Sequence, residues 1–272
     1  AAALKIIFLF APTGLICKTA LPRKTKMTFN ENGLILKEQN IGERDKLVTV
    51  LTANHGVLRA FVRGAKAVKS KKQSATSKFC YAKLSLYQGK DSYIIDEAQS
   101  IEMFFGLRDS IDALALGEYF LELGFVFSPE EQAAEENLRV ILNSLYMLSN
   151  KKRPPKLLKA ITELRLLSVG GYAPNLVACD KCGCFETPTM YFDMEGILYC
   201  ENCAPATAPF ALPLGVVSAM RHIVFSELRD LYNFKLDDAL CDELGYVTET
   251  YLLRQTGHKF KTLDFYNSVQ AL

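Results

Sequence analysis

Two pairs of cysteines carry the clearest chemical pattern in this 272-residue sequence. Cys179 and Cys182 form one C-x-x-C pair, and Cys200 and Cys203 form a second pair 17 residues further on. Each pair can place two thiolates on one tight turn, and two such turns provide the tetrahedral set of sulfur ligands that suits Zn²⁺. Because four thiolates fill the coordination shell, we expect a structural zinc site rather than a catalytic one.

Other interpretations of these cysteines stay open at this stage. The two pairs could instead be redox-active, or they could form a degenerate site that has lost its metal. Cys184 lies close behind the first pair and is either a spare thiol or an alternative ligand. Five of the eight cysteines fall within residues 179–203, and the dispersed pairs of a secreted disulfide framework are absent. This distribution favours a reducing, cytoplasmic setting.

A second pattern is a run of positive charge. From Lys46 to Lys90 there are ten lysines and arginines and not one Asp or Glu, although the net charge of the whole chain is only +2. A local positive field of this kind attracts polyanions, of which nucleic acid is the commonest. The alternative is a solvated basic surface that has no partner.

Alternation along two predicted strands makes the basic run more specific. In Val57–Arg63 and Lys78–Tyr87 one side of the strand is apolar, and the other side mixes cations with aromatic rings. Cations bind phosphates and rings stack on bases, so we predict nucleic-acid binding with little sequence preference. The predicted contacts are Arg59, Phe61, Arg63, Lys66, Lys69, Lys71, Lys72, Lys78, Tyr81 and Lys83. The alternative is that the rings pack beneath a helix while the lysines are merely solvated.

The elements that must position these residues are of two kinds. After Met27, five strand patterns within about 75 residues predict a small antiparallel barrel. The predicted strands are Gly33–Gln39, Lys46–Ala53, Val57–Arg63, Lys78–Tyr87 and Ser92–Phe104. The lysine-rich segment 64–77 has no apolar period, so we predict a mobile loop between the third and fourth strands.

From Arg108 onward the apolar period becomes helical. The predicted helices begin near Ile111, Ser128, Pro155, Leu214 and Leu236. Ser128-Pro129-Glu130-Glu131 has the residue types of a capped helix start. Residues 91–150 carry twelve acidic residues against two basic ones, so we expect the acidic excess to lie on the helical part.

Residues 1–26 are predicted to be an extension outside the fold. Their apolar stretch resembles that of a signal peptide, but it lacks a positive start and an A-x-A cleavage pattern. A lipoprotein signal ending at Cys17 is the alternative. No stretch is long enough to span a bilayer. Nucleotide-binding and hydrolase motifs are absent from the sequence, and we therefore expect no enzyme.

Two blocks of the sequence resemble the RecO family of bacterial DNA repair proteins. The first comprises residues 33–36 (GLIL), 42–52 (GERDKLVTVLT), Gly56 and 63–66 (RGAK). The second is residues 170–174 (GGYAP), which lead into the cysteine pairs. The resemblance covers the chain from about Met27 to its C-terminal end.

This resemblance implies an α+β protein with an OB-type barrel over 27–106 and an α-helical domain over 107–272, with the zinc ribbon inserted at about 172–207. It implies binding of single- and double-stranded DNA, annealing of complementary strands, and work with RecR to load RecA onto DNA coated with single-strand-binding protein. The acidic tail of that protein would need an apolar pocket beside a cation, such as Arg139 or Arg221. The implied location is the cytoplasm, at the nucleoid. The alternatives are an RNA-directed OB-fold factor of translation or ribosome assembly with a structural zinc, and a metal-dependent enzyme.

Overall fold

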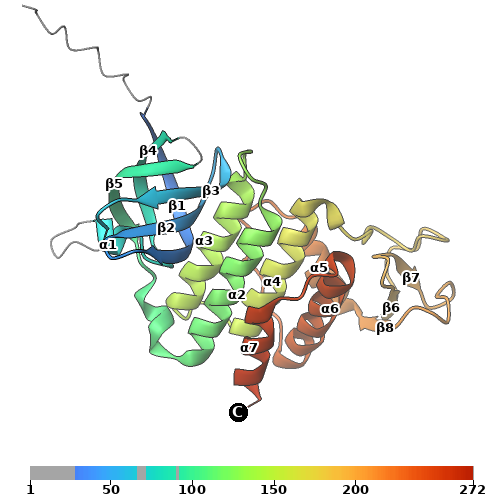
Figure 1. The fold of residues 1–272 in the computed structure, drawn as a ribbon. Coiled ribbons are helices and arrows are strands. Elements are labelled where there is room, and N and C mark those ends of the chain that lie inside the picture. Colours follow the sequence, from blue (N-terminus) through green and yellow to red (C-terminus); the bar gives the residue numbers. More distant parts are fainter. Residues whose placement is uncertain (1–27, 66–71, 90–91, 272) are drawn as a thin grey trace, which may run out of the picture.

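The computed structural model describes residues 28–65, 72–89 and 92–271. It shows a strand-rich part, a helical body and a small second sheet, which lies at the opposite end of the helical body from the strand-rich part (Figure 1). The predicted extension over residues 1–26 lies outside the described residues. None of the helices found in the described ranges is both long enough and apolar enough to cross a membrane.

The strand-rich part is a five-stranded closed barrel. Its strands are β1 (Thr28–Ile41), β2 (Asp45–Thr52), β3 (Gly56–Val62), β4 (Tyr81–Gln88) and β5 (Tyr93–Glu102). They pair in the order β1-β2-β3-β5-β4, and β4 pairs back to β1. The prediction of an antiparallel barrel is wrong at one pairing, because β3 and β5 run parallel where Ala60–Val62 lies opposite Tyr93–Ile95. Alternation locates strands in a sequence, but it does not give the direction in which non-consecutive strands pair.

The helical body follows a short 3₁₀ turn at Phe105–Asp109. Its helices are α2 (Ile111–Phe127), α3 (Glu135–Ser149), α4 (Pro155–Leu167), α5 (Leu214–Phe225), α6 (Asp238–Thr256) and α7 (Lys261–Gln270). A π-helical turn at Ser168–Tyr172 extends α4. A further short helix, α1 (Lys72–Ala75), occupies part of the segment predicted to be a loop. α7 was not predicted from the sequence; it packs against α2 in the core through Leu263 and Tyr266.

The barrel and the helical body share one hydrophobic core. Leu34, Leu51 and Val57 of the barrel belong to the same buried cluster as the inner faces of the helices. The joint also rests on backbone contacts, since the Val57 N–H donates to the Pro129 carbonyl at 2.9 Å. Gly56 has a positive φ of 57°, and a Cβ added there would lie 2.1 Å from the Pro129 oxygen. The barrel is therefore held rigidly against the helices.

The same joint explains why the predicted helix start at Ser128 is wrong. α2 ends at Phe127 and α3 begins only at Glu135, so residues 128–134 form a linker. In this linker Glu131 has a φ of 56°, which is incompatible with a right-handed helix. The Pro129 carbonyl accepts the hydrogen bond from β3, and the Ala134 N–H donates to Ala53 of the barrel at 2.8 Å. Tertiary contacts with the barrel thus override the local capping pattern.

The second sheet is built around the cysteine pairs. Its strands are β6 (Thr189–Phe192), β7 (Leu198–Cys200) and β8 (Phe210–Pro213), in the order β7-β6-β8. The β6–β7 hairpin joins the two cysteine pairs, and β8 adds a third strand that was not predicted. α6 supports the turn of the hairpin, because the Gln255 side chain donates to the Met194 carbonyl at 2.7 Å. The Tyr251 ring packs directly against Gly196 in the same turn.

Candidate nucleic-acid interface and candidate metal centre

β3 carries two of the residues predicted to contact nucleic acid, and a third follows it directly. Leu58 and Ala60 point into the barrel core, whereas Arg59 is exposed and Phe61 is half-buried outside both hydrophobic cores. Arg63 follows the strand and is also exposed. Within the part of the chain that the structure describes, neither arginine side chain has an ion-pair partner. Their charges are therefore available to a phosphate.

The strand register adds neighbours that the sequence analysis did not identify. Arg59 lies opposite Thr49 on β2, and Thr49 lies opposite Lys37 on β1. In the same way, Phe61 on β3 lies opposite Leu47 on β2, and Leu47 lies opposite Gln39 on β1. We define the β1–β2–β3 face as Lys37, Gln39, Leu47, Thr49, Arg59, Phe61 and Arg63. Arg59 and Phe61 are exposed on the β3 part of this face, whereas the Lys37 ammonium group lies over the Phe125 ring of α2, 3.8 Å from its centroid.

Two of the residues predicted to contact nucleic acid instead contact other parts of the protein. Lys78 lies before β4 rather than on it, and its ammonium group donates to Glu118 of α2 at 2.8 Å. Tyr81 is half-buried and packs against the core that joins the barrel to the helices. For this ring the alternative interpretation, packing beneath a helix, describes the structure better than exposure to a base. Neither residue belongs to the β1–β2–β3 face.

Two other predicted contacts, Lys72 and Lys83, are not on this face. Lys83 is exposed on β4, and Lys72 lies at the start of α1. Both line a pocket of about 540 Å³ on a different wall of the barrel. Lys66, Lys69 and Lys71 lie outside the described residues. The acidic excess is not confined to the helices either, since β5 carries Asp96, Glu97 and Glu102.

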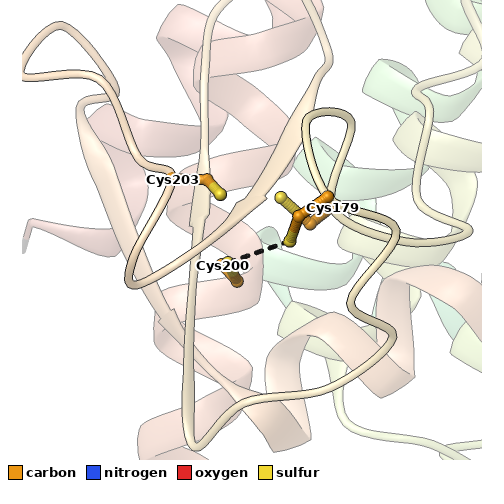
Figure 2. A group of neighbouring side chains, drawn as sticks. Cys179, Cys200 and Cys203 are labelled. Atoms are coloured by element: carbon orange, nitrogen blue, oxygen red, sulfur yellow. Dashed lines mark hydrogen bonds between the residues drawn. The ribbon is translucent and has the colours of Figure 1, made fainter.

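The four predicted metal ligands converge on one point. The sulfur atoms of Cys179, Cys182, Cys200 and Cys203 all lie within 4.8 Å of one another, and Figure 2 shows three of these side chains turned toward the same centre. The Cys182 and Cys200 sulfurs are 3.6 Å apart. A tetrahedral zinc site with Zn–S bonds of about 2.3 Å requires sulfurs separated by roughly 3.8 Å. The donor set therefore fits Zn²⁺ in both chemistry and spacing.

Two tight turns hold the sulfurs in place. In the first, the Gly183 N–H donates to the Cys179 carbonyl at 2.8 Å, and the positive φ of 72° at Gly183 permits this turn. In the second, the Ala204 N–H donates to the Cys200 carbonyl at 3.0 Å. Cys184 lies outside the group of four, and its thiol donates to the Glu186 carbonyl at 3.5 Å. Its place outside the group favours the interpretation of a spare thiol.

The electrostatics of this group favour a bound cation. Burial opposes ionisation of the Cys179 thiol, but nearby backbone N–H groups outweigh it and lower its pKa to about 6. Hydrogen bonding with the Cys182 and Cys200 sulfurs, together with burial, raises the pKa of Cys203 to about 12. Four sulfurs this close cannot all carry negative charge unless a metal ion compensates them. A divalent cation that prefers sulfur ligands would supply this compensation.

Comparisons with known proteins cover both parts of the chain. The family model described as "Recombination protein O N terminal" matches residues 27–104, and the one described as "Recombination protein O C terminal" matches residues 108–264. The chain belongs to the RecO family. The predicted resemblance is confirmed, and RecO-family membership assigns this chain to DNA repair and recombination.

Individual relatives agree with the RecO assignment over nearly the full length. The DNA repair protein RecO of Acetivibrio thermocellus is 31% identical over 243 residues, which cover 89% of this chain and 97% of the relative. The DNA repair protein RecO of Clostridium novyi is 29% identical and covers 88% of this chain and 93% of its own length. The protein of the same name from Symbiobacterium thermophilum is 26% identical, with 89% and 98% covered.

Proposed function

We propose that this chain binds single- and double-stranded DNA through the β1–β2–β3 face and anneals complementary strands. The observation that carries the proposal is that Arg59 on β3 and Arg63 just after it are exposed on either side of the partly exposed Phe61 ring in the sequence. Among the described residues neither arginine has an ion-pair partner. A RecO-family chain with this surface has the two kinds of contact that nucleic acid needs, which are ionic contacts to phosphate and stacking contacts to bases.

The chemistry of this face supports binding without base recognition. Arginine forms strong, bidentate contacts to phosphate oxygens, which every nucleotide carries. A base of any kind can stack on Phe61, since stacking uses the faces of the rings and not their edges. On this account DNA of any sequence binds with similar affinity, and the affinity falls steeply as salt rises.

We further propose that the barrel is of the OB type and that it forms a DNA-binding domain over residues 27–106. The strand order β1-β2-β3-β5-β4 and the family match to residues 27–104 support this division. The remaining domain, 107–272, would carry the zinc ribbon as an insertion at about 172–207. The match to residues 108–264 supports this boundary as well.

Zinc is the metal that the four cysteines would hold. Cys179, Cys182, Cys200 and Cys203 supply only sulfur, so a bound Zn²⁺ would be coordinately saturated and would serve as a structural cross-link. The chain would then need no catalytic step, and we propose that it acts as a mediator rather than an enzyme. The distance of this site from the barrel, at the far end of the helical body, supports a bracing role rather than a DNA contact (Figure 1).

The RecO family also implies partners for this chain. We propose that it works with RecR in the bacterial cytoplasm, at the nucleoid, to load RecA onto DNA coated with single-strand-binding protein. Of the two arginines suggested for the acidic tail of that protein, Arg221 is already engaged by the carbonyls of Leu176, Val177 and Phe185. Arg139 is paired with Glu135 at 3.7 Å on an open helix surface.

Another candidate receptor for such a tail lies between the α3–α4 connection and α7. A pocket of about 770 Å³ has an apolar floor that includes Leu148 and Pro155, and its rim carries basic side chains. The basic residues of the lining are Lys151, Lys152, Arg153 and Lys156, of which Lys151 is paired with Asp109 and Lys156 with Asp242. The apolar side chains of an acidic tail could pack on this apolar surface while its carboxylates meet the basic side chains.

Fluorescence annealing of complementary oligonucleotides tests this proposal most simply. At low salt the protein should accelerate annealing well above the protein-free rate, and Arg59→Glu/Arg63→Glu should abolish the acceleration. No acceleration by the wild-type chain would refute the proposed activity. Competition between single-stranded DNA and structured RNA on the same protein separates the DNA-directed function from the RNA-directed alternative.

A further inference from the structure

The barrel carries two groups of cations on two different walls. One group belongs to the β1–β2–β3 face. The second comprises Lys83 on β4 and Lys72 on α1. Between β3 and β4 lies β5, which pairs with Phe61 through Ile94 and with Lys83 through Gln99. The stretch of β5 between these two pairings exposes Asp96 and Glu97, so acidic side chains separate the two groups on this side.

The route around the other side of the barrel is also interrupted. There β1 is the strand that both groups share, because Lys37 lies in the row of Arg59 and Asn32 lies opposite Lys83. These two positions on β1 are five residues apart, which corresponds to roughly 16 Å along a strand. No lysine or arginine stands between them on β1. The two groups are therefore separate binding surfaces rather than two ends of one surface.

The second group lines a pocket with suitable chemistry for a nucleotide strand. This pocket of about 540 Å³ is bounded by β1, β4, β5 and the start of α1. Lys83 is exposed and has no ion-pair partner among the described residues, so its ammonium group can meet a phosphate. Asn30, Ser85 and Gln99 supply amides and a hydroxyl that can hydrogen-bond to sugars and bases. Glu97 of β5 also lines the pocket, and its carboxylate disfavours a nucleotide strand that crosses β5 toward the β1–β2–β3 face.

We propose that this pocket is a second nucleic-acid site, which holds one strand while the β1–β2–β3 face holds another. The inference rests on the proposed DNA-binding function and adds a second strand to it. Two strands held on one small barrel meet at an effective concentration on the order of millimolar, far above that of free oligonucleotides. The barrel itself then brings complementary strands together, with no need for a second protein molecule.

Energy transfer between labelled strands tests the second site. A donor-labelled and an acceptor-labelled oligonucleotide of the same non-complementary sequence, each about twelve nucleotides long to match one barrel site, are titrated onto the full-length protein. Light scattering verifies that the protein stays monomeric. The variants are Lys83→Glu and the milder Lys83→Gln, and the control is Lys235→Glu, which reverses an exposed lysine between α5 and α6.

The wild-type chain and the Lys235→Glu control should bind two strands per chain and give energy transfer between them. Lys83→Glu should weaken the second strand by about tenfold, and the first by less than about threefold, because it removes a phosphate contact at one site only. Lys83→Gln should show the same asymmetry to a smaller degree. Saturation of the wild-type chain at one strand, or equal two-strand binding by Lys83→Glu, overturns the second site while leaving DNA binding intact. A wild-type chain that binds no DNA overturns the proposed function itself.

Discussion

At one end of the molecule Arg59 on β3 and Arg63 just after it are exposed, while at the other end four cysteine sulfurs turn inward toward one another. The two regions differ in what satisfies their polar groups. Among the described residues the arginines have no ionic partner, so a ligand must come from outside. The sulfurs form a closed set of four donors, with room for a metal ion and nothing else.

This difference allows mutations to distinguish side chains that bind DNA from side chains that stabilise the fold. A side chain that is exposed and unpaired adds little to folding, and its removal should change affinity for DNA. A side chain in the sulfur cluster holds a hairpin of short strands, and its removal should change folding. Mutations of the arginines should therefore change DNA affinity but not stability, and mutations of the cysteines should change stability but not DNA affinity.

The largest effect should come from loss of the metal site. Cys179→Ser/Cys200→Ser, or removal of metal by a strong chelator, should lower the melting temperature by more than about 10 °C, because binding free energy at such a site is folding free energy. DNA affinity should change by less than about threefold. Melting followed by circular dichroism measures the first quantity. The matched control is Cys184→Ser, which should have the melting temperature of the wild-type chain. Equal melting temperatures with and without metal would show that the metal does not stabilise the fold.

Reversal of the two arginines should produce the opposite pattern. Arg59→Glu/Arg63→Glu should weaken single-stranded DNA binding by about a hundredfold, since two phosphate contacts become repulsive. The melting temperature should stay within about 2 °C, because both side chains are exposed. Fluorescence anisotropy with a labelled oligonucleotide measures the affinity, with Lys235→Glu as the charge-matched control. A comparable loss in the control would mean that only the net charge matters.

A smaller effect is expected from the aromatic ring. Phe61→Ala should weaken single-stranded DNA binding by about tenfold, since stacking on one ring contributes roughly 1–3 kcal/mol. Binding of the duplex, whose bases are already stacked, should weaken less. Phe265→Ala is a suitable control, because Phe265 is 48% exposed on α7. Equal losses for single strands and duplex would argue against stacking at Phe61.

The smallest effect concerns Lys78, which the sequence analysis grouped with the DNA contacts. Lys78→Gln should change DNA affinity by less than about twofold, because Glu118 already neutralises this ammonium. It should lower the free energy of unfolding by about 0.5 kcal/mol, the usual size of a partly exposed ion pair. A double-mutant cycle with Glu118→Gln measures that coupling by urea unfolding. A tenfold loss of DNA affinity would instead show that Lys78 contacts DNA.

Much of this arrangement could be predicted from the sequence, because the signals involved are local. The spacing of the cysteines within each pair fixes which sulfurs share a turn, so the sulfur cluster was found correctly. The alternation of Leu58, Arg59, Ala60 and Phe61 correctly separated the buried from the exposed side of β3. The two prolines before α4 likewise marked its start, at Pro155.

The features that the sequence did not reveal depend on contacts between distant segments. Lys37 adjoins Glu38 in the sequence, and only the pairing of β1 with β2 places it in the row of Arg59. Lys78 has the residue type of a DNA contact, but its partner Glu118 lies forty residues away. The separation of Lys83 from Arg59 follows from β5 pairing between β3 and β4, which no local pattern encodes.

The salt dependence of DNA binding tests the central claim most directly, since ionic contacts at Arg59 and Arg63 predict a specific change in it. The dissociation constant for a single-stranded oligonucleotide should be measured against salt for the wild-type chain and for Arg59→Gln/Arg63→Gln. If the two arginines contact phosphates, the slope of log affinity against log salt becomes shallower by about 1.4, or about 0.7 for each phosphate that the variant no longer neutralises. An unchanged slope would contradict the central claim, because the two arginines would then not contact the phosphates.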